Sequence, residues 1–152
     1  MLGIPRRNLR SASTETKTNA YITMVRSNLE YCASAWHPHQ KKYEQNIEMV
    51  QRRASRFILD IYHNTSNVTS MLDELSWETL KSRRIKIQLT NLYKIQHDLI
   101  DVEASKYLTK WSTTARSKHS SRLNLYQPSS DQFKFSFFPR TIIHRYSLPA
   151  CG

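Results

Sequence analysis

Glycine is nearly absent from this chain: Gly3 and Gly152 are the only two among 152 residues, against a usual share of about 7%. Tight hairpins, phosphate-binding loops and dinucleotide-binding fingerprints all depend on glycine, because it adopts left-handed backbone conformations at little cost. The scarcity therefore excludes enzymes of the Rossmann and P-loop type. It favours helices, whose connections can be built from Pro, Asn, Ser and Asp.

Cysteines and long apolar runs are also scarce. The two cysteines, Cys32 and Cys151, form neither a disulfide framework nor a zinc quartet, and we interpret both as free thiols. No apolar run approaches the roughly 18 residues of a membrane span, and residues 1–10 lack the apolar core of a secretion signal. We therefore expect an intracellular protein, nuclear or cytoplasmic, with no membrane partner.

Positive charge, in contrast, is present in excess. The chain has 23 Lys and Arg against 12 Asp and Glu, a net charge of +11. Both ends are basic: residues 1–60 carry 10 basic and 5 acidic side chains, residues 61–103 carry 5 and 6, and residues 104–152 carry 8 and 1. This distribution favours phosphate-rich partners.

Apolar side chains recur at helical spacing through most of the chain, which predicts a mainly α fold of amphipathic helices. A first helix is expected to begin after Ser13 or Thr14 and to end before His37-Pro38-His39. Further helices are expected over 43–61, 68–75, 77–99 and 102–108. The expected buried residues are Tyr21, Met24, Val25, Leu29, Cys32 and Trp36 in the first helix, Tyr43, Ile47, Val50, Ala54, Phe57 or Ile58, and Ile61 in the second, and Leu80, Ile85, Leu89, Leu92, Ile95 and Leu99 in the helix over 77–99.

The C-terminal part is expected to differ from the rest. Phe133, Phe135 and Phe137 alternate with polar residues, which is the period of a strand, and Pro139 suits the first turn of a closing helix that runs to Tyr146. We therefore predict three regions: a helical, thumb-like region 1–108, a basic Ser/Thr-rich loop 109–132, and a short Phe-rich strand plus a short helix over 133–152.

A series of short motifs also runs along the chain. They are Leu2-Gly3, Arg6-Arg7-Asn8-Leu9, Ala20-Tyr21, Leu29-Glu30-Tyr31, Ala33-Ser34, Trp36-His37-Pro38-His39, Glu48-Met49-Val50-Gln51-Arg52-Arg53-Ala54, Arg56-Phe57, Val68-Thr69-Ser70-Met71-Leu72, Glu74-Leu75, Trp77, Leu80, Arg83-Arg84, Leu92-Tyr93-Lys94, Ser136-Phe137-Phe138-Pro139-Arg140-Thr141-Ile142 and Ser147-Leu148-Pro149. In their order and spacing they resemble the C-terminal region of the reverse transcriptase of non-LTR retrotransposons, LINE-class elements of the jockey and chicken-repeat type. One segment departs from the family: Ile143-His144-Arg145-Tyr146 stand where its members usually have Arg-Asp-Trp-Asn.

The resemblance implies a thumb-like and post-thumb helical segment that follows the fingers and palm of the polymerase and holds RNA or an RNA/DNA template-primer. It also implies Mg²⁺ in the parent RNA-directed DNA polymerase, held by an aromatic-x-Asp-Asp turn and an earlier Asp. This chain has no Asp-Asp pair, and its adjacent acids Asp73-Glu74 lack the preceding aromatic turn. We therefore expect the chain by itself to be no enzyme and to hold no cofactor.

Basic side chains on the long helices and near the C-terminus are the candidate nucleic-acid-binding residues. Helices favour contacts to phosphates over base reading, so little sequence preference is expected. Glu48 is placed to pair with Arg52, which leaves Arg53 and Arg56 without acidic partners in the same turns. The full set is Arg52, Arg53, Arg56, Arg83, Arg84, Lys86, Arg116, Lys118, Arg122 and Arg140, with His119 beside them.

Other residues are interpreted as structural. Stacking on bases is possible for Phe133, Phe135, Phe137 and Phe138, but core packing is the commoner use, as for Trp36, Trp77 and Tyr93. Neither His37 with His39 nor Cys32 has the partners that a metal site or a nucleophile requires. The alternative function is a helical scaffold or docking module for the polymerase core without nucleic-acid affinity, in which the second helix would bury its apolar seam only in the full protein.

Overall fold

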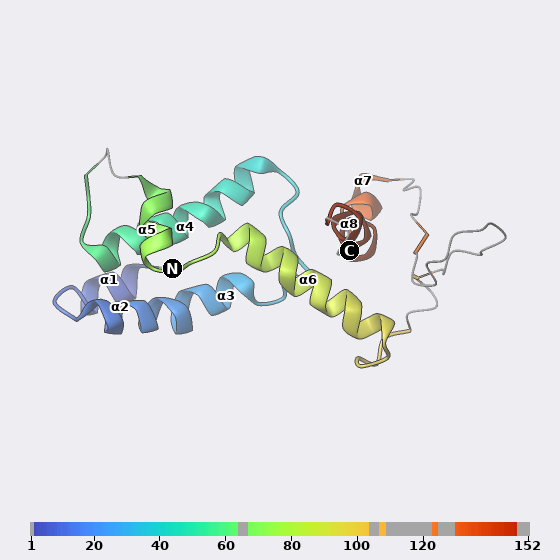
Figure 1. The fold of residues 1–152 in the computed structure, drawn as a ribbon, viewed down its shortest axis with the longest axis horizontal. Coiled ribbons are helices and arrows are strands. Elements are labelled where there is room, and N and C mark those ends of the chain that lie inside the picture. The colour runs from blue at the N-terminus through green and yellow to red at the C-terminus, as the bar shows by residue number, and fades with distance from the viewer. Residues whose placement is uncertain (1, 64–66, 104–106, 109–122, 125–129, 149–152) are drawn as a thin grey trace. The chain divides into compact units, whose positions relative to one another are not determined.

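A computed structural model of the chain describes residues 2–63, 67–103, 107–108, 123–124 and 130–148. These residues are mainly helical, as predicted. The chain divides into two compact units, Met1–Arg84 and Ile85–Gly152, which are coloured from blue to yellow-green and from yellow-green to red in Figure 1. The long helix α6 (Leu80–Gln96) contributes its first turn to unit 1 and the rest to unit 2.

Unit 1 begins with a short helix, α1 (Gly3–Asn8), that the sequence patterns do not predict. The predicted first helix follows as α2 (Thr14–Ala20), a π-helical segment η1 (Tyr21–Arg26) and α3 (Ser27–Glu30). The Ser13 side chain accepts a hydrogen bond from the Thr16 backbone N–H and so caps its start, where the sequence places it.

This first helix ends earlier than predicted. Tyr31 leaves the helical conformation and Cys32 has a positive φ of 51°, so the helix stops before the proline that was expected to end it. Cys32 is exposed rather than part of the apolar stripe, and Met24, at 53% exposure, also faces away from the core. The π-helical segment η1 explains the exposure of Met24, because a π-helical turn changes the side of the helix on which the following side chains lie.

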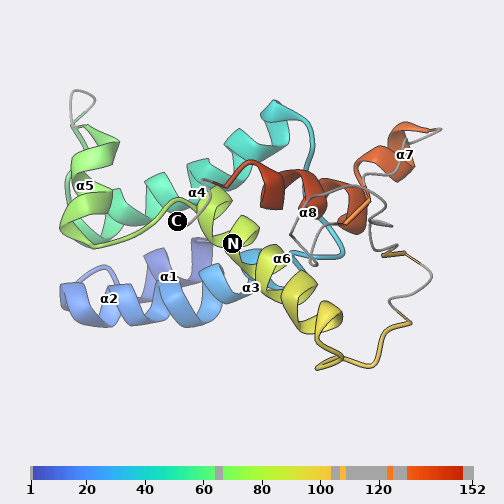
Figure 2. The same cartoon turned by 45° about the vertical axis from the view of Figure 1, so that its right-hand side comes forward.

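The second predicted helix is confirmed as α4 (Lys41–Leu59). It runs antiparallel to α2, η1 and α3 and lies beside them (Figure 2). The C-terminal half of its predicted seam is buried, with Ala54, Phe57 and Ile58 all at 4% exposure or less, whereas Tyr43 at its start is 53% exposed. Asp60 ends the helix in the left-handed conformation.

The predicted short helix is confirmed as α5 (Val68–Glu74), and it packs on α4. Asn67 caps it through its side-chain oxygen. The buried cluster of unit 1 draws on η1, α3, α4 and the first turn of α6: Tyr21, Val25, Leu29, Ala54, Phe57, Ile58 and Leu80.

Chain reversals use residues other than glycine. Among the described residues, four that are not glycine have positive φ: Cys32, Asp60, Ser76 and Asp98. Asp60 and Asp98 lie at or just beyond helix C-termini, the position where glycine is usual. This matches the expectation that Ser and Asp replace glycine in the connections of this chain.

In unit 2 the described residues of the predicted Phe-rich strand form two helices and the turn between them instead. Residues 131–134 form α7 (Asp131–Lys134) and residues 137–146 form α8 (Phe137–Tyr146), so the described residues contain no Phe-rich strand. The Ser130 hydroxyl caps α7 by accepting from the Phe133 N–H, and the Ser136 hydroxyl donates to the Phe133 carbonyl. These local hydrogen bonds compete with extended geometry and outweigh the alternation of the phenylalanines.

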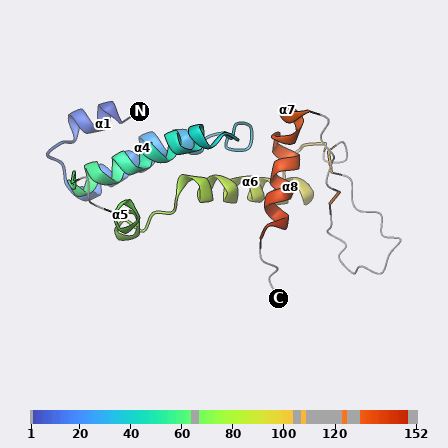
Figure 3. The ribbon, with the colours of Figure 1, turned by 90° about the horizontal axis from the view of Figure 1, so that it is seen from above.

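The core of unit 2 forms where α8 lies across α6 (Figure 3). Leu92, Leu123 and Ile142 are its buried members, with Leu108, Phe137 and Phe138 packed against them. The Tyr146 hydroxyl donates to the Leu123 carbonyl at 2.8 Å and accepts from the Leu123 N–H at 2.9 Å. α6 is shorter than the predicted 77–99, and Leu99 lies outside it at 66% exposure.

Two predictions remain on residues that the structure describes only in part or not at all. Of the brief helix expected over 102–108, residues 102–103 and 107–108 are not helical, and residues 104–106 lie outside the described residues. Residues 109–122 and 125–129 of the predicted loop also lie outside them.

Candidate nucleic-acid interface

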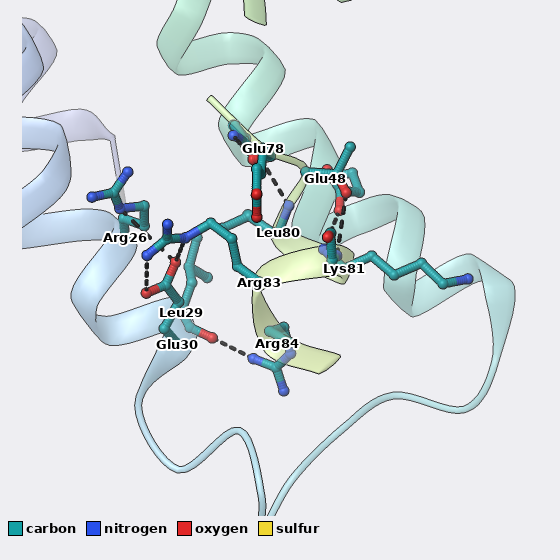
Figure 4. Close-up of polar contacts among 12 residues, drawn as sticks. Arg26, Leu29, Glu30, Glu48, Glu78, Leu80, Lys81, Arg83 and Arg84 are labelled. Carbon is teal, nitrogen blue, oxygen red and sulfur yellow. Dashed lines mark hydrogen bonds and ion pairs between the residues drawn. The ribbon is translucent and has the colours of Figure 1, made fainter. Parts of the chain in front are cut away.

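Two of the three predicted arginines of α4 lie at the surface, where a ligand can reach them. Arg52 and Arg53 are exposed, and Arg56 is half-buried with its Nε atom enclosed and without a hydrogen-bond partner among the described residues. The predicted pair between Glu48 and Arg52 is wrong. The Glu48 carboxylate instead accepts a hydrogen bond of 2.7 Å from the Lys81 N–H and caps the start of α6, as Figure 4 shows.

Arg83 is committed to a partner within unit 1. Its guanidinium donates from Nε and Nη2 to the two carboxylate oxygens of Glu30 (Figure 4). The hydrogen bond to Glu30 raises the pKa of Arg83. Arg26 also lies 3.9 Å from the same carboxylate. A two-point ion pair of this kind neutralises the positive charge that would attract a phosphate. Arg83 therefore stabilises unit 1 through Glu30.

Arg84 is buried, at 2% exposure, so the structure does not present its guanidinium at the surface, and its phosphate contact stays a prediction. Its Nη1 and Nη2 atoms donate to the backbone carbonyls of Leu29 and Trp36, and its guanidinium lies 4.0 Å from the centroid of the Trp36 ring. Burial lowers its pKa. The side chain therefore ties α6 to the segment that follows α3, where the backbone carbonyls have no helical partner.

In unit 2, Lys86 is exposed on α6, whereas Arg140 is buried at 8% exposure. Arg140 donates from Nη1 to the Phe135 carbonyl at 2.7 Å and from Nε to the Gln88 side-chain oxygen at 3.3 Å. Its guanidinium therefore connects α8 to α6 and to the end of α7, and its role as a phosphate ligand stays a prediction. Arg116, Lys118, His119 and Arg122 lie outside the described residues.

Sequence reasoning missed Arg6 of α1 and Arg10, which lies two residues beyond the end of that helix. Arg6 and Arg10 line a cavity of about 540 Å³ together with Phe57, Asp60 and Tyr62. Arg6 also lines an adjoining cavity of about 290 Å³ whose wall includes Arg53 of α4. The available signal was the presence of three arginines, Arg6, Arg7 and Arg10, within five residues without an acidic neighbour.

The structural interpretation of the aromatic residues is confirmed in part. Trp77 stacks on Tyr21, with ring centroids 4.6 Å apart, and Phe137 and Phe138 pack on the core of unit 2. Tyr93, at 57% exposure, is not a core residue. Trp36 is 42% exposed, and it contacts the protein through Arg84 and through its indole N–H, which donates to the Tyr31 carbonyl at 2.8 Å.

The described residues contain no group of three or more His, Cys, Asp or Glu side chains that could hold a metal ion. The His37 Nε2 atom lies 3.8 Å from a carboxylate oxygen of Glu44. Within the same described ranges, no helix combines the length and the apolar character that crossing a bilayer requires.

Comparison with known proteins adds no identification. The chain has no significant match to a family model, to a curated protein or to a solved structure.

Proposed function

We propose that this chain is the non-catalytic C-terminal part of a non-LTR retrotransposon reverse transcriptase, and that unit 1 binds the phosphate backbone of RNA or of an RNA/DNA template-primer. The order of the short motifs supports the family assignment. One observation carries the binding proposal: Arg52 and Arg53 of α4 are exposed and have no carboxylate within ion-pair distance in the described residues. The Mg²⁺ chemistry would belong to the upstream fingers and palm.

The environment of these arginines favours phosphate contacts over base reading. The nearest carboxylate along the helix, Glu48, is occupied by the N–H of Lys81, so the charges of Arg52 and Arg53 are not neutralised locally. Both side chains project from a helix surface without a rigid second group that would align them with a base edge. We therefore expect binding that depends steeply on salt and little on sequence.

Fluorescence anisotropy of labelled RNA and of an RNA/DNA template-primer, measured at several salt concentrations, tests the proposal. The doubly substituted chain Arg52→Gln/Arg53→Gln should bind more weakly at low salt, and the slope of log K against log salt should fall by about one to two. Lys41→Gln/Lys42→Gln is the matched control, because it removes two exposed charges from the other end of the same helix.

Equal effects of the two double substitutions would indicate a non-specific charge effect and would count against a binding role for the α4 arginines. A folded chain that binds neither probe at low salt would overturn the function. The family assignment has its own test, because the genomic DNA upstream of the Met1 codon should encode an aromatic-x-Asp-Asp motif in frame.

Exposed apolar side chains favour a second candidate, a docking module for the polymerase core. Met24 on η1 and Tyr43 and Met49 on α4 are 42% to 53% exposed. The predicted seam is not such a surface over its full length, because Ala54 and Phe57 are already buried within unit 1. A well-folded chain without nucleic-acid affinity that binds a separately produced fingers and palm fragment would support this candidate.

A further inference from the structure

Two cavities of unit 1 are lined by residues of α1 and of the C-terminal end of α4, and we call them together the α1–α4 groove. Arg6 and Phe57 line both cavities, so the two cavities are adjacent. The larger one, of about 540 Å³, lies within the range of roughly 300–1,000 Å³ that is typical of small-molecule sites. It is therefore large enough for one nucleotide unit.

Positive charge dominates this groove. Arg6, Arg10 and Arg53 line it and are exposed, and none of them has an ion-pair partner among the described residues. The single acidic lining residue, Asp60, is paired with the buried ammonium of Lys17, which donates to its Oδ2 atom at 2.8 Å. Because Lys17 neutralises Asp60, the three arginines leave an uncompensated positive field for an anion.

An aromatic ring is exposed in the same groove. Tyr62 is 53% exposed, and the Arg6 guanidinium lies 5.8 Å from the centroid of its ring. An arginine held over an aromatic face keeps the N–H groups at its edge available for a phosphate oxygen. The remaining exposed surface of Tyr62 is available for stacking. Phe57, at 4% exposure, supplies an apolar floor.

We propose that the α1–α4 groove binds a nucleotide of single-stranded RNA, with Arg6, Arg10 and Arg53 on the phosphates and the base stacked against Tyr62. This inference rests on the proposed nucleic-acid binding and names the form of nucleic acid that this groove accepts. Cationic grooves with aromatic platforms are typical of single-strand binding, because every unpaired base has a face to stack. In a duplex the bases are stacked on one another and cannot enter a hollow of this size.

Fluorescence anisotropy of the full chain with labelled oligouridine, and with a double-stranded RNA of equal length, tests the inference. Tyr62→Leu should weaken oligouridine binding about ten-fold, since it removes one stacking platform, and should change duplex binding less than about two-fold. Tyr43→Leu is the matched control, because Tyr43 has the same 53% exposure but lies at the other end of α4. Tyr62→Phe should retain the affinity, because it retains the ring.

Arg10→Gln is a second, independent variant, because Arg10 is exposed and its substitution leaves the ring and the core intact. It should lower the salt slope for oligouridine by about one. The inference is overturned if the chain binds duplex but not oligouridine, or if Tyr62→Leu and Arg10→Gln leave oligouridine binding unchanged. Either result would leave backbone binding by α4 standing, whereas no binding to either probe would overturn both proposals.

Discussion

The arginine pair of α4 and the arginine pair at the start of α6 differ in what surrounds them. Arg52 and Arg53 are exposed on α4, and the nearest carboxylate along that helix, Glu48, accepts a hydrogen bond from the Lys81 N–H. Arg83 is paired with Glu30, and Arg84 is enclosed at 2% exposure between two backbone carbonyls and an indole ring. The two dipeptides are identical in composition, so the number of arginines in a helical segment does not tell how many of them can bind a ligand.

The difference arises from the neighbours that each helix meets. On α4, Arg52 lies away from the buried row of Ala54, Phe57 and Ile58, and Arg53 lies exposed beside that row, where it lines a cavity with Phe57. Arg84 lies four residues after Leu80 and four before Gln88, on a row that is buried throughout. A long guanidinium on that row reaches carbonyls at the end of α3, where a shorter polar side chain would leave them without donors.

Among these arginines, substitution of Arg84 should lower the free energy of unfolding the most. Arg84→Ala removes the donors of the Leu29 and Trp36 carbonyls and leaves a void beside the indole ring, so we expect a loss of about 3 kcal/mol in the free energy of unfolding. Arg84→Lys should recover little of it, because an ammonium cannot bridge both acceptors in a planar fork. Urea denaturation followed by circular dichroism measures both, and a loss below about 1 kcal/mol would contradict a structural role.

Arg140 offers the same test in unit 2. Arg140→Ala should cost about 2 kcal/mol, since the Phe135 carbonyl and the Gln88 side chain lose a charged donor. Thermal unfolding would measure the loss, and hydrogen exchange in α8 would locate it. If the variant kept its stability but lost RNA affinity, Arg140 would be a ligand-binding residue after all, as its position in the motif suggests.

The buried hydroxyl of Tyr21 should make the stability of unit 1 depend on pH. Its hydroxyl is buried without a hydrogen-bond partner among the described residues, and burial raises its pKa above the ordinary value of 10. Between pH 10 and the raised pKa, the unfolded chain releases this proton while the folded chain keeps it. Stability should therefore fall as pH rises above 10, by about 1.4 kcal/mol per pH unit for this one group.

The Tyr21→Phe variant should lack this part of the alkaline loss and should be at least as stable as the natural chain at pH 7, because no hydrogen bond is removed. Urea denaturation between pH 8 and 11 on the two chains measures the difference, and Tyr43→Phe serves as the exposed control. Parallel pH profiles for the natural chain and Tyr21→Phe would show that the hydroxyl is solvated in solution.

The smallest effect on stability is expected at the exposed pair. Arg52→Ala and Arg53→Ala should each change the free energy of unfolding by no more than about 0.5 kcal/mol, since both side chains are exposed and neither has an ion-pair partner among the described residues. The same urea denaturation detects this. A large loss at either position would mean that the α4 arginines, like those of α6, serve the fold.

Much of the secondary structure could be predicted from local patterns. The α4 helix follows from apolar residues at steps of three and four, and α5 follows from the capping residue Asn67. The predicted strand failed because alternation of Phe133, Phe135 and Phe137 is a weaker signal than the serines that begin α7 and α8. The early end of the first helix at Glu30 had no local signal beyond the chain's need to turn before α4.

The sequence by itself determined that the chain is helical, basic and without a Gly-rich phosphate loop, because composition and periodicity act within a few residues. Only the tertiary structure decided which arginines are left for a partner. Arg83 meets a carboxylate 53 positions away and Arg84 a carbonyl 55 positions away, while Arg6 and Arg53 come together at one groove. The charge of an arginine is a property of its side chain. Whether that charge is neutralised depends on groups that folding brings near from distant parts of the chain, and local sequence patterns do not show these groups.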